Sequence, residues 1–238
     1  MKKHKKVVIV MPAYNATKTL EKTLREIPMR YVDDILLVDD CSKDNTVELS
    51  RKLGLKTIVH KVNKGYGGNQ KTCYKAALKM GADVIVMLHP DYQYDPKKIP
   101  QMIKPILEGE VDVVHGSRIL LKGGATKGGM PLYKRVGNII LSKFYSLMLG
   151  TNLTDVPTGY ISYSRKVLKT IPFLRNSNGF TFDEEALIEC VSKGFKIKEI
   201  PIPTRYEEDS SSTTLIDCID YTLRLVYKVT RYKLTGKI

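Results

Sequence analysis

The sequence predicts an α/β domain built on a mostly parallel sheet, and three observations lead to this prediction. Short apolar runs alternate with segments of helical periodicity through residues 1–90, in the order β-α-β-α-β-α-β. This alternation is typical of parallel strands joined by right-handed helical crossovers. Polar residues directly follow three of the apolar runs, and open α/β sheets bind ligands at the carboxyl ends of their strands.

The first strand and helix follow from an apolar run and a helical repeat. Residues 6–11 read KVVIVM, which is typical of a strand buried on both faces. The turn PAYN at 12–15 precedes a predicted helix over residues 17–27, where leucine and isoleucine recur at helical spacing. Asn15 therefore lies between the first strand and the helix that follows it.

The next elements repeat this arrangement. Residues 34–38 (DILLV) predict a second strand, which ends in a pair of aspartates. Asp44 is a good N-cap for a helix that runs to about Leu53, and Gly54 ends it. The remaining elements of this half are a strand at 56–59, a glycine-rich loop at 63–71 that opens a helix to Met80, and a strand at 83–88.

The second half ends in a long amphipathic helix whose polar positions carry arginine and lysine. Two polar segments, at 120–131 and 207–214, are expected to be mobile loops. The predicted helices are 96–107, 132–149, 180–193 and 215–234; the predicted strands are 111–115, 160–163 and 197–200; a polar turn spans 152–159.

The composition excludes several classes of protein. A chain of 238 residues with 42% hydrophobic and 27% charged residues can bury one good-sized core and is not disordered. No run approaches the length of a membrane span, and the basic start is interpreted as a strand of a cytoplasmic protein rather than a signal peptide. The four cysteines show no metal-binding spacing.

The net charge of +14 is compatible with nucleic acid, anionic lipid or polyphosphate ligands. Lysine and arginine are spread along the whole chain, and no nucleic-acid-binding motif is present. We therefore expect no nucleic-acid partner.

The stretch 84–96 (VIVMLHPDYQYDP) carries the strongest indication of function. Five apolar residues predict a buried strand, which ends abruptly in polar side chains. His89, Asp91 and Gln93 alternate along the chain and are hard or borderline metal ligands. This pattern indicates a site for a divalent cation, Mg²⁺ or Mn²⁺, together with a sugar nucleotide.

Seven motifs in order resemble those of family 2 glycosyltransferases of the GT-A fold, a Rossmann-like single domain. The resemblance is greatest to the polyprenyl-phosphate (dolichyl-phosphate) hexosyltransferases. It implies a GT-A domain over residues 1–212 and a C-terminal amphipathic helix over 213–238, packed on the domain or at a membrane surface. The motifs are PAYN at 12–15, VDDCSKDNT at 38–46, NKGYGGNQK at 63–71, HPDYQYDP at 89–96, GSR at 116–118, DVPTGY at 155–160 and F-x-x-E at 182–185.

The resemblance implies roles for individual residues. The turn at 12–14 would line the base pocket, Asp40 would hold the base or ribose, and Arg118 and Arg135 would meet phosphates. The implied contacts to the nucleotide sugar are Pro12, Ala13, Tyr14, Asn15, Asp39, Asp40, Gly65, Lys71, His89, Pro90, Arg118 and Arg135. The implied catalytic residues are Asp91, Asp155, Arg118, Asp183 and Glu185.

The chain departs from the family pattern at one position. Asp91 and Gln93 match the second acidic residue and the glutamine of the D-x-D-x-Q metal motif, but His89 replaces the first aspartate. An imidazole suits Mn²⁺ better than Mg²⁺. His89 is therefore either a third metal ligand or a hydrogen-bond donor to the diphosphate.

The resemblance implies an inverting transferase that moves a hexose from a UDP- or GDP-linked donor to a polyprenyl or dolichyl phosphate. A phosphate acceptor is already largely a dianion at neutral pH, so it needs no protein base. A hydroxyl acceptor is the alternative, with Asp183 or Glu184 as base; a non-catalytic nucleotide-sugar-binding protein is a third. The basic final helix and net charge also favour peripheral association with the cytoplasmic face of a membrane.

Overall fold

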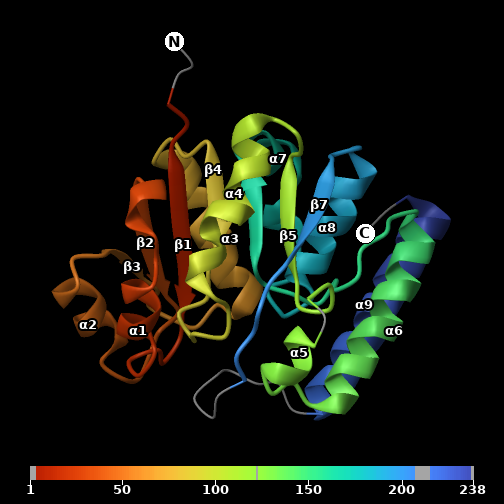
Figure 1. The fold of residues 1–238 in the computed structure, drawn as a ribbon, viewed down its shortest axis with the longest axis horizontal. Helices are drawn as coiled ribbons and strands as arrows, with labels where there is room; N and C mark the ends of the chain where they lie inside the picture. The colour runs from red at the N-terminus through yellow and green to blue at the C-terminus, as the bar shows by residue number, and fades with distance from the viewer. Residues whose placement is uncertain (1–3, 122, 207–214, 237–238) are drawn as a thin grey trace.

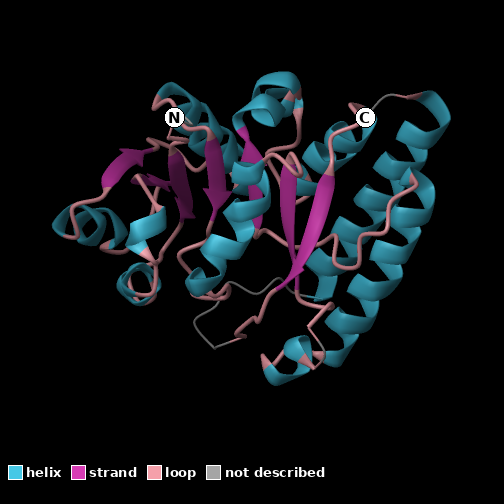
Figure 2. Cartoon of the chain, turned by 45° about the horizontal axis from the view of Figure 1, so that its top comes forward, coloured by secondary structure: helices cyan, strands magenta, loops and turns pink. Residues whose placement is uncertain are grey.

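Seven strands form a single sheet with helices on both faces (Figures 1 and 2). The structure is a computed structural model that describes residues 4–121, 123–206 and 215–236. The strands are β1 (Val7–Ala13), β2 (Asp34–Asp39), β3 (Lys56–Val59), β4 (Val84–Met87), β5 (Val113–Ser117), β6 (Ile161–Ser164) and β7 (Ile197–Pro201). Their order across the sheet is β3-β2-β1-β4-β6-β5-β7, which confirms the predicted mostly parallel α/β domain.

Nine α-helices and three 3₁₀ turns are present among the described residues. The turns cover Met29–Tyr31, Pro96–Lys98 and Phe173–Arg175. The helices are α1 (Leu20–Arg25), α2 (Thr46–Lys52), α3 (Tyr66–Lys79), α4 (Ile99–Glu108), α5 (Gly124–Lys127), α6 (Leu132–Leu149), α7 (Arg165–Thr170), α8 (Phe182–Ser192) and α9 (Leu215–Thr235).

One strand runs against the rest. β1, β2, β3 and β4 pair in parallel, as do β5 and β7. β6 lies between β4 and β5 and is antiparallel to both. The carboxyl ends of the other six strands therefore lie at one edge, at the bottom of Figure 1.

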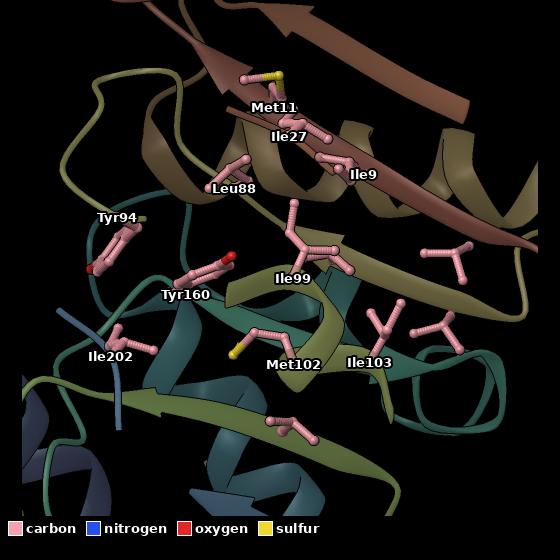
Figure 3. Close-up of a cluster of buried hydrophobic side chains, with 14 of the residues drawn as sticks. Ile9, Met11, Ile27, Leu88, Tyr94, Ile99, Met102, Ile103, Tyr160 and Ile202 are labelled. Carbon is pink, nitrogen blue, oxygen red and sulfur yellow. The ribbon is translucent and has the colours of Figure 1, made fainter. Parts of the chain in front are cut away.

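The core consists of two layers because side chains alternate along each strand. Val7, Ile9 and Met11 of β1 join a cluster with α1 and α4, whereas Val8 and Val10 face α3, α7 and α8. Figure 3 shows the first cluster, in which Ile9 and Met11 lie with Leu88, Ile99 and Met102. Both faces of the sheet are covered, which agrees with the uninterrupted apolar runs in its strands.

Helices α6 and α9 run side by side at one end of the molecule in both views (Figures 1 and 2). They share a third apolar cluster with α8, in which Tyr145, Leu187, Leu225 and Val229 are buried. The C-terminal helix is therefore packed on the domain. None of the helices within the described ranges is long and apolar enough to span a bilayer.

Two details differ from the sequence prediction. The segment expected as a mobile loop at 120–131 contains α5, and Tyr206 N–H donates to the Gly128 carbonyl at 2.7 Å. Helix α7 was not predicted; the Ser164 side chain caps it by accepting from Val167 N–H. The other expected loop, 207–214, lies outside the described residues.

Candidate functional site

The ends of β1, β2 and β4 lie next to one another at the carboxyl edge. Ala13 pairs with Asp39 in the sheet, and Asp40 N–H donates to the Ala13 carbonyl at 2.9 Å. Leu88 N–H donates to the Val10 carbonyl at 3.0 Å. This bond brings the start of residues 89–96, called the HPD segment below, beside the other two strand ends. The three strand ends that carry the predicted polar residues therefore converge.

The turn at 12–15 and the two aspartates are held by local hydrogen bonds. Asp39 accepts from Ser42 N–H at 3.0 Å, and Asn15 Oδ1 accepts from Lys43 N–H at 2.8 Å. Asn15 has a positive φ of 52°, a conformation that asparagine tolerates better than most residues. Tyr14 is 50% exposed, and its contact with a base stays a prediction.

Asp40 organises the glycine-rich loop. It is buried, and its two carboxylate oxygens accept from Lys64 N–H at 2.9 Å and from Gly65 N–H at 3.0 Å. His60 Nδ1 lies 2.7 Å from the same carboxylate. The structure therefore gives Asp40 an anchoring role, while its contact with the base or ribose stays a prediction.

The glycine-rich loop packs against residues 176–179. Gly65 has φ 79°, and a Cβ there would lie 2.7 Å from the Asn178 carbonyl oxygen. Lys71 Nζ donates to Asn178 Oδ1 at 2.7 Å and to the Asn176 carbonyl. The Lys71 ammonium thus ties α3 to this loop, and its predicted phosphate contact stays a prediction.

A hydrogen-bonded cluster lies beside the end of β4. The Tyr66 hydroxyl donates to Asp183 Oδ2 at 2.7 Å, and Gln70 Nε2 donates to the same oxygen at 3.1 Å. His89 Nε2 lies 3.3 Å from the Tyr66 hydroxyl, and the two rings are stacked with an interplanar angle of 7°. Residues from α3, α8 and the HPD segment therefore meet at one point.

Burial shifts the protonation equilibria in this cluster. It raises the pKa of Asp183 to about 6, although the bonds from Tyr66 and Gln70 oppose that rise. Burial lowers the pKa of His89, while the nearby charge of Asp91 acts in the opposite direction. Asp183 Oδ1 is buried without a hydrogen-bond partner in the described part of the chain.

The predicted metal ligands lie together at the start of the segment after β4. Asp91 Oδ1 accepts from Gln93 N–H at 3.0 Å, and the Asp91 charge is close enough to act on His89. The described residues contain no group of three or more His, Cys, Asp or Glu side chains suited to a metal. A carboxylate, an amide and an imidazole fit a cation that takes its other ligands from substrate phosphates.

Arg118 and Asp155 form a buried bidentate pair. Arg118 Nε and Nη2 donate to the two Asp155 oxygens at 2.7 and 2.8 Å, and Arg118 N–H adds a third bond at 2.8 Å. Burial alone would lower the pKa of Arg118, but the Asp155 charge raises it well above its usual value. Arg118 Nη1 also donates to the Tyr206 hydroxyl at 3.1 Å, and burial raises the pKa of Tyr206 while the Arg118 charge opposes that rise.

A hollow of about 280 Å³ lies next to this pair. Arg118, Arg135 and α5 line it, and Arg135 Nη1 donates to Thr126 Oγ1 at 2.9 Å. The two arginines predicted to meet phosphates therefore share one cavity. The 205–206 segment links this cavity to the segment of the predicted metal ligands, because Arg205 N–H donates to the Gln93 carbonyl at 2.9 Å and the Tyr206 hydroxyl accepts from Arg118.

Two acidic residues of α8 have partners on the C-terminal helix α9. Glu185 accepts from Thr181 Oγ1 at 2.7 Å and pairs with Lys228 of α9 at 3.0 Å. Glu184 accepts from the Tyr221 hydroxyl at 2.5 Å, and burial raises its pKa well above its usual value. Both carboxylates are therefore held by α9, and the roles expected for Glu184 as a base and for Glu185 as a catalytic residue stay predictions.

Several residues of the site were not singled out from the sequence. Tyr66 and Gln70 belong to the glycine-rich motif, yet nothing local shows that they meet Asp183. Tyr206 ends the turn that follows the predicted strand at 197–200. Glu199 accepts from Thr154 N–H at 2.8 Å and Asp155 N–H at 3.1 Å, which fixes the loop that carries Asp155. Only their spatial neighbours reveal these roles.

The model of the family described as "Glycosyl transferase family 2" matches residues 8–171. The chain belongs to glycosyl transferase family 2. Its fold confirms the GT-A prediction: it superposes with a TM-score of 0.74 and 17% identity on glucosyl-3-phosphoglycerate synthase from Mycobacterium tuberculosis, over 97% of this chain and 79% of the other. That protein was crystallised with Mn²⁺, uridine diphosphate and phosphoglyceric acid.

Relatives of greater sequence identity include three with assigned activities. A UDP-N-acetylglucosamine–dolichyl-phosphate N-acetylglucosaminyltransferase of Methanococcus voltae is 33% identical over 87% of this chain and 88% of its own length. A dolichyl-phosphate hexose transferase of Haloferax volcanii is 32% identical over 88% and 86%. An undecaprenyl-phosphate mannosyltransferase of Micrococcus luteus is 28% identical over 83% and 82%. The family 2 transferase therefore resembles polyprenyl-phosphate glycosyltransferases, as the motifs indicated.

Proposed function

We propose that this family 2 transferase moves a hexose, with inversion, from a UDP- or GDP-linked donor to a polyprenyl phosphate. One observation carries the proposal: Arg118 and Arg135 line a single cavity, and the 205–206 segment connects Arg118 to the chain beside Gln93. The named relatives that act on dolichyl or undecaprenyl phosphate support the same acceptor class.

The arrangement of acidic residues favours a phosphate acceptor over a hydroxyl acceptor. A phosphate monoester is already largely a dianion at neutral pH and needs only cationic groups to hold it. The two candidate bases are both buried and already hydrogen-bonded. Asp183 accepts bonds from Tyr66 and Gln70, and Glu184 accepts a bond from Tyr221. A cavity lined by two guanidinium groups is suited to a phosphate because their positive charge attracts it, and Arg135 has donors left to bind it.

A divalent cation would stabilise the charge that develops on the leaving diphosphate. Asp91, Gln93 and His89 would hold it, together with oxygens of the donor. Glucosyl-3-phosphoglycerate synthase, which shares this fold, has been crystallised with Mn²⁺ or Mg²⁺ and uridine diphosphate, which supports this assignment. The chain itself contributes the base pocket at 12–15 and the positioning of the donor at the strand edge.

We further propose that α6 and α9 dock on an anionic membrane surface. Each helix exposes an apolar stripe, as shown by Leu147 at 80% and Leu223 at 65% exposure. Lys143, Arg231 and Lys233 are exposed on the same two helices. A second copy would bring like charges face to face, whereas anionic headgroups attract them. The stripe members are Leu132, Tyr133, Val136, Ile140 and Leu147 on α6 and Ile219, Leu223, Tyr227 and Leu234 on α9.

The function is tested by incubating the protein with UDP-glucose, UDP-N-acetylglucosamine or GDP-mannose and Mn²⁺ or Mg²⁺, with and without a short polyprenyl phosphate. We expect nucleoside diphosphate release that depends on the lipid. Release only with a saccharide acceptor would support the alternative acceptor class. Binding without any release would support a non-catalytic nucleotide-sugar-binding protein.

Asp91→Ala tests the metal assignment within this function. Removing a carboxylate ligand should abolish turnover while leaving thermal unfolding unchanged, because the Asp91 side chain is only partly buried. Full activity in this variant would rule out Asp91 as a ligand.

A further inference from the structure

His89 stands where the family motif has its first aspartate, and the structure surrounds its ring with specific contacts. A neutral imidazole has one N–H donor and one nitrogen lone pair, so the partner of one nitrogen decides what the other can do. Nε2 lies 3.3 Å from the Tyr66 hydroxyl. The direction of that hydrogen bond therefore determines whether Nδ1 is free to bind a metal.

The neighbouring hydrogen bonds fix this direction. Gln70 Oε1 accepts from the Tyr74 hydroxyl at 3.1 Å, so the Gln70 amide directs its Nε2 donor to Asp183 Oδ2. Asp183 Oδ2 is therefore an acceptor whether or not the other oxygen carries a proton. Tyr66 must donate its hydroxyl proton to it across 2.7 Å. The Tyr66 oxygen has only lone pairs left, so His89 Nε2 must carry the hydrogen.

The ring is also confined sterically. The His89 and Tyr66 rings stack with centroids 5.4 Å apart, and Phe180 lies on Tyr66 at 5.2 Å. A Cβ at Gly159 would lie 2.9 Å from both His89 Nε2 and the Tyr66 hydroxyl. Glycine at this position is what allows the backbone to approach so closely, and the approach leaves the imidazole little room to turn over.

We propose that Tyr66, held by Asp183, is a positioning residue that keeps His89 in the Nε2–H form, so that Nδ1 replaces the absent carboxylate as a cation ligand. Metal-binding histidines generally donate their second ring N–H to a fixed partner in this way. The inference rests on the proposed function only for the presence of the cation. A nitrogen in place of a carboxylate favours Mn²⁺ over Mg²⁺.

The test is a Mn²⁺ titration in the presence of UDP for four proteins: wild type, Tyr66→Phe, His89→Ala and the double variant. Tyr66→Phe keeps the stacked ring and should weaken Mn²⁺ binding by about 10- to 100-fold, as loss of such a partner commonly does. In the His89→Ala background the same change should cost about 2-fold or less, because Tyr66 acts through His89. Tyr145→Phe is the control: it removes a buried hydroxyl that donates to the Glu184 carbonyl.

Pulsed EPR of the Mn²⁺ complex supplies a second measurement that does not depend on affinity. We expect modulation from a directly coordinated nitrogen in the wild type and none in His89→Ala. Equal losses from Tyr66→Phe in both backgrounds would overturn the positioning role. Weaker UDP binding without metal, combined with no nitrogen signal, would instead make His89 a diphosphate contact. None of these measurements requires sugar transfer, so failure of the proposed function would show separately in the turnover assay.

Discussion

The buried pair of Arg118 and Asp155 allows the loss of one partner to be estimated. Arg118→Met keeps most of the side-chain volume but leaves the Asp155 carboxylate, which is 0% exposed, with Arg118 N–H as its remaining partner from this pair. Removing one member of a buried ion pair costs about 3–5 kcal/mol. For a chain of this length that corresponds to a fall in Tm of roughly 10 °C.

Urea unfolding followed by circular dichroism measures this loss, with Arg135→Met as the matched control. Arg135 lines the same cavity, but among the described residues its side chain donates only to Thr126, so its removal should change stability by about 0.5 kcal/mol or less. The double variant Arg118→Met/Asp155→Leu should recover part of the loss, because no unpaired charge remains buried. A loss below about 1 kcal/mol for Arg118→Met would refute the reasoning.

This comparison also decides how activity data are to be interpreted. An Arg118 variant that loses activity has lost the support of the loop that carries Asp155, so its effect does not report phosphate binding alone. Arg135→Met should raise the KM for the lipid phosphate while leaving the unfolding midpoint unchanged. Arg135 is therefore the cleaner probe of the acceptor site.

Three further predictions concern other parts of the molecule. Burial raises the pKa of Asp183 from 3.8 to about 6, so the folded state binds the Asp183 proton more tightly than the unfolded state. Stability therefore falls as pH rises from about 4 to about 6. Asp183→Asn should show a smaller fall in Tm over that interval. Ile140→Glu and Leu223→Glu should reduce cosedimentation with anionic vesicles without lowering Tm, since both side chains are already exposed; unchanged binding would contradict docking by these helices. Gly65→Ala should destabilise the protein more than Gly54→Ala. Both positions have a positive φ, which costs an alanine about 1–2 kcal/mol, but of the two only Gly65 would also place its Cβ 2.7 Å from a carbonyl oxygen. Equal losses of stability in urea unfolding would argue against that contact.

The sequence predicts the first half of the fold well because its signals are local. Apolar runs, caps and glycine stops place β1 to β4 and their helices close to their observed bounds. The direction of β6 has no such signal, since four residues that read YISY look the same in a parallel or an antiparallel pair. The short helix α7 was missed for a similar reason: six residues are too few for a clear helical period.

In the candidate site too, features with a local signal were predicted and contacts between distant parts of the chain were not. The carboxyl ends of parallel strands lie at one edge of a sheet, and this correctly predicts that Asp39, Asp40 and the HPD segment lie close together. The partners of Asp183 are Tyr66 and Gln70, more than 110 residues earlier in the chain, and periodicity carries no information about such contacts. The partners of Lys71 and Glu185, which are Asn178 and Lys228, could not be predicted either, because a motif identifies residue types and not the neighbours that packing selects.

The first turn of α8 shows why the site and the C-terminal helix cannot be considered separately. Its three consecutive carboxylates have three different partners: Asp183 holds Tyr66, Glu184 accepts from Tyr221, and Glu185 pairs with Lys228. The last two partners belong to α9, which also exposes the apolar stripe assigned to the membrane. A buried carboxylate is costly without its partner, so α9 must stay docked for this turn to keep its position. The helix that would meet the lipid surface therefore also supports the turn that orients Tyr66 toward His89.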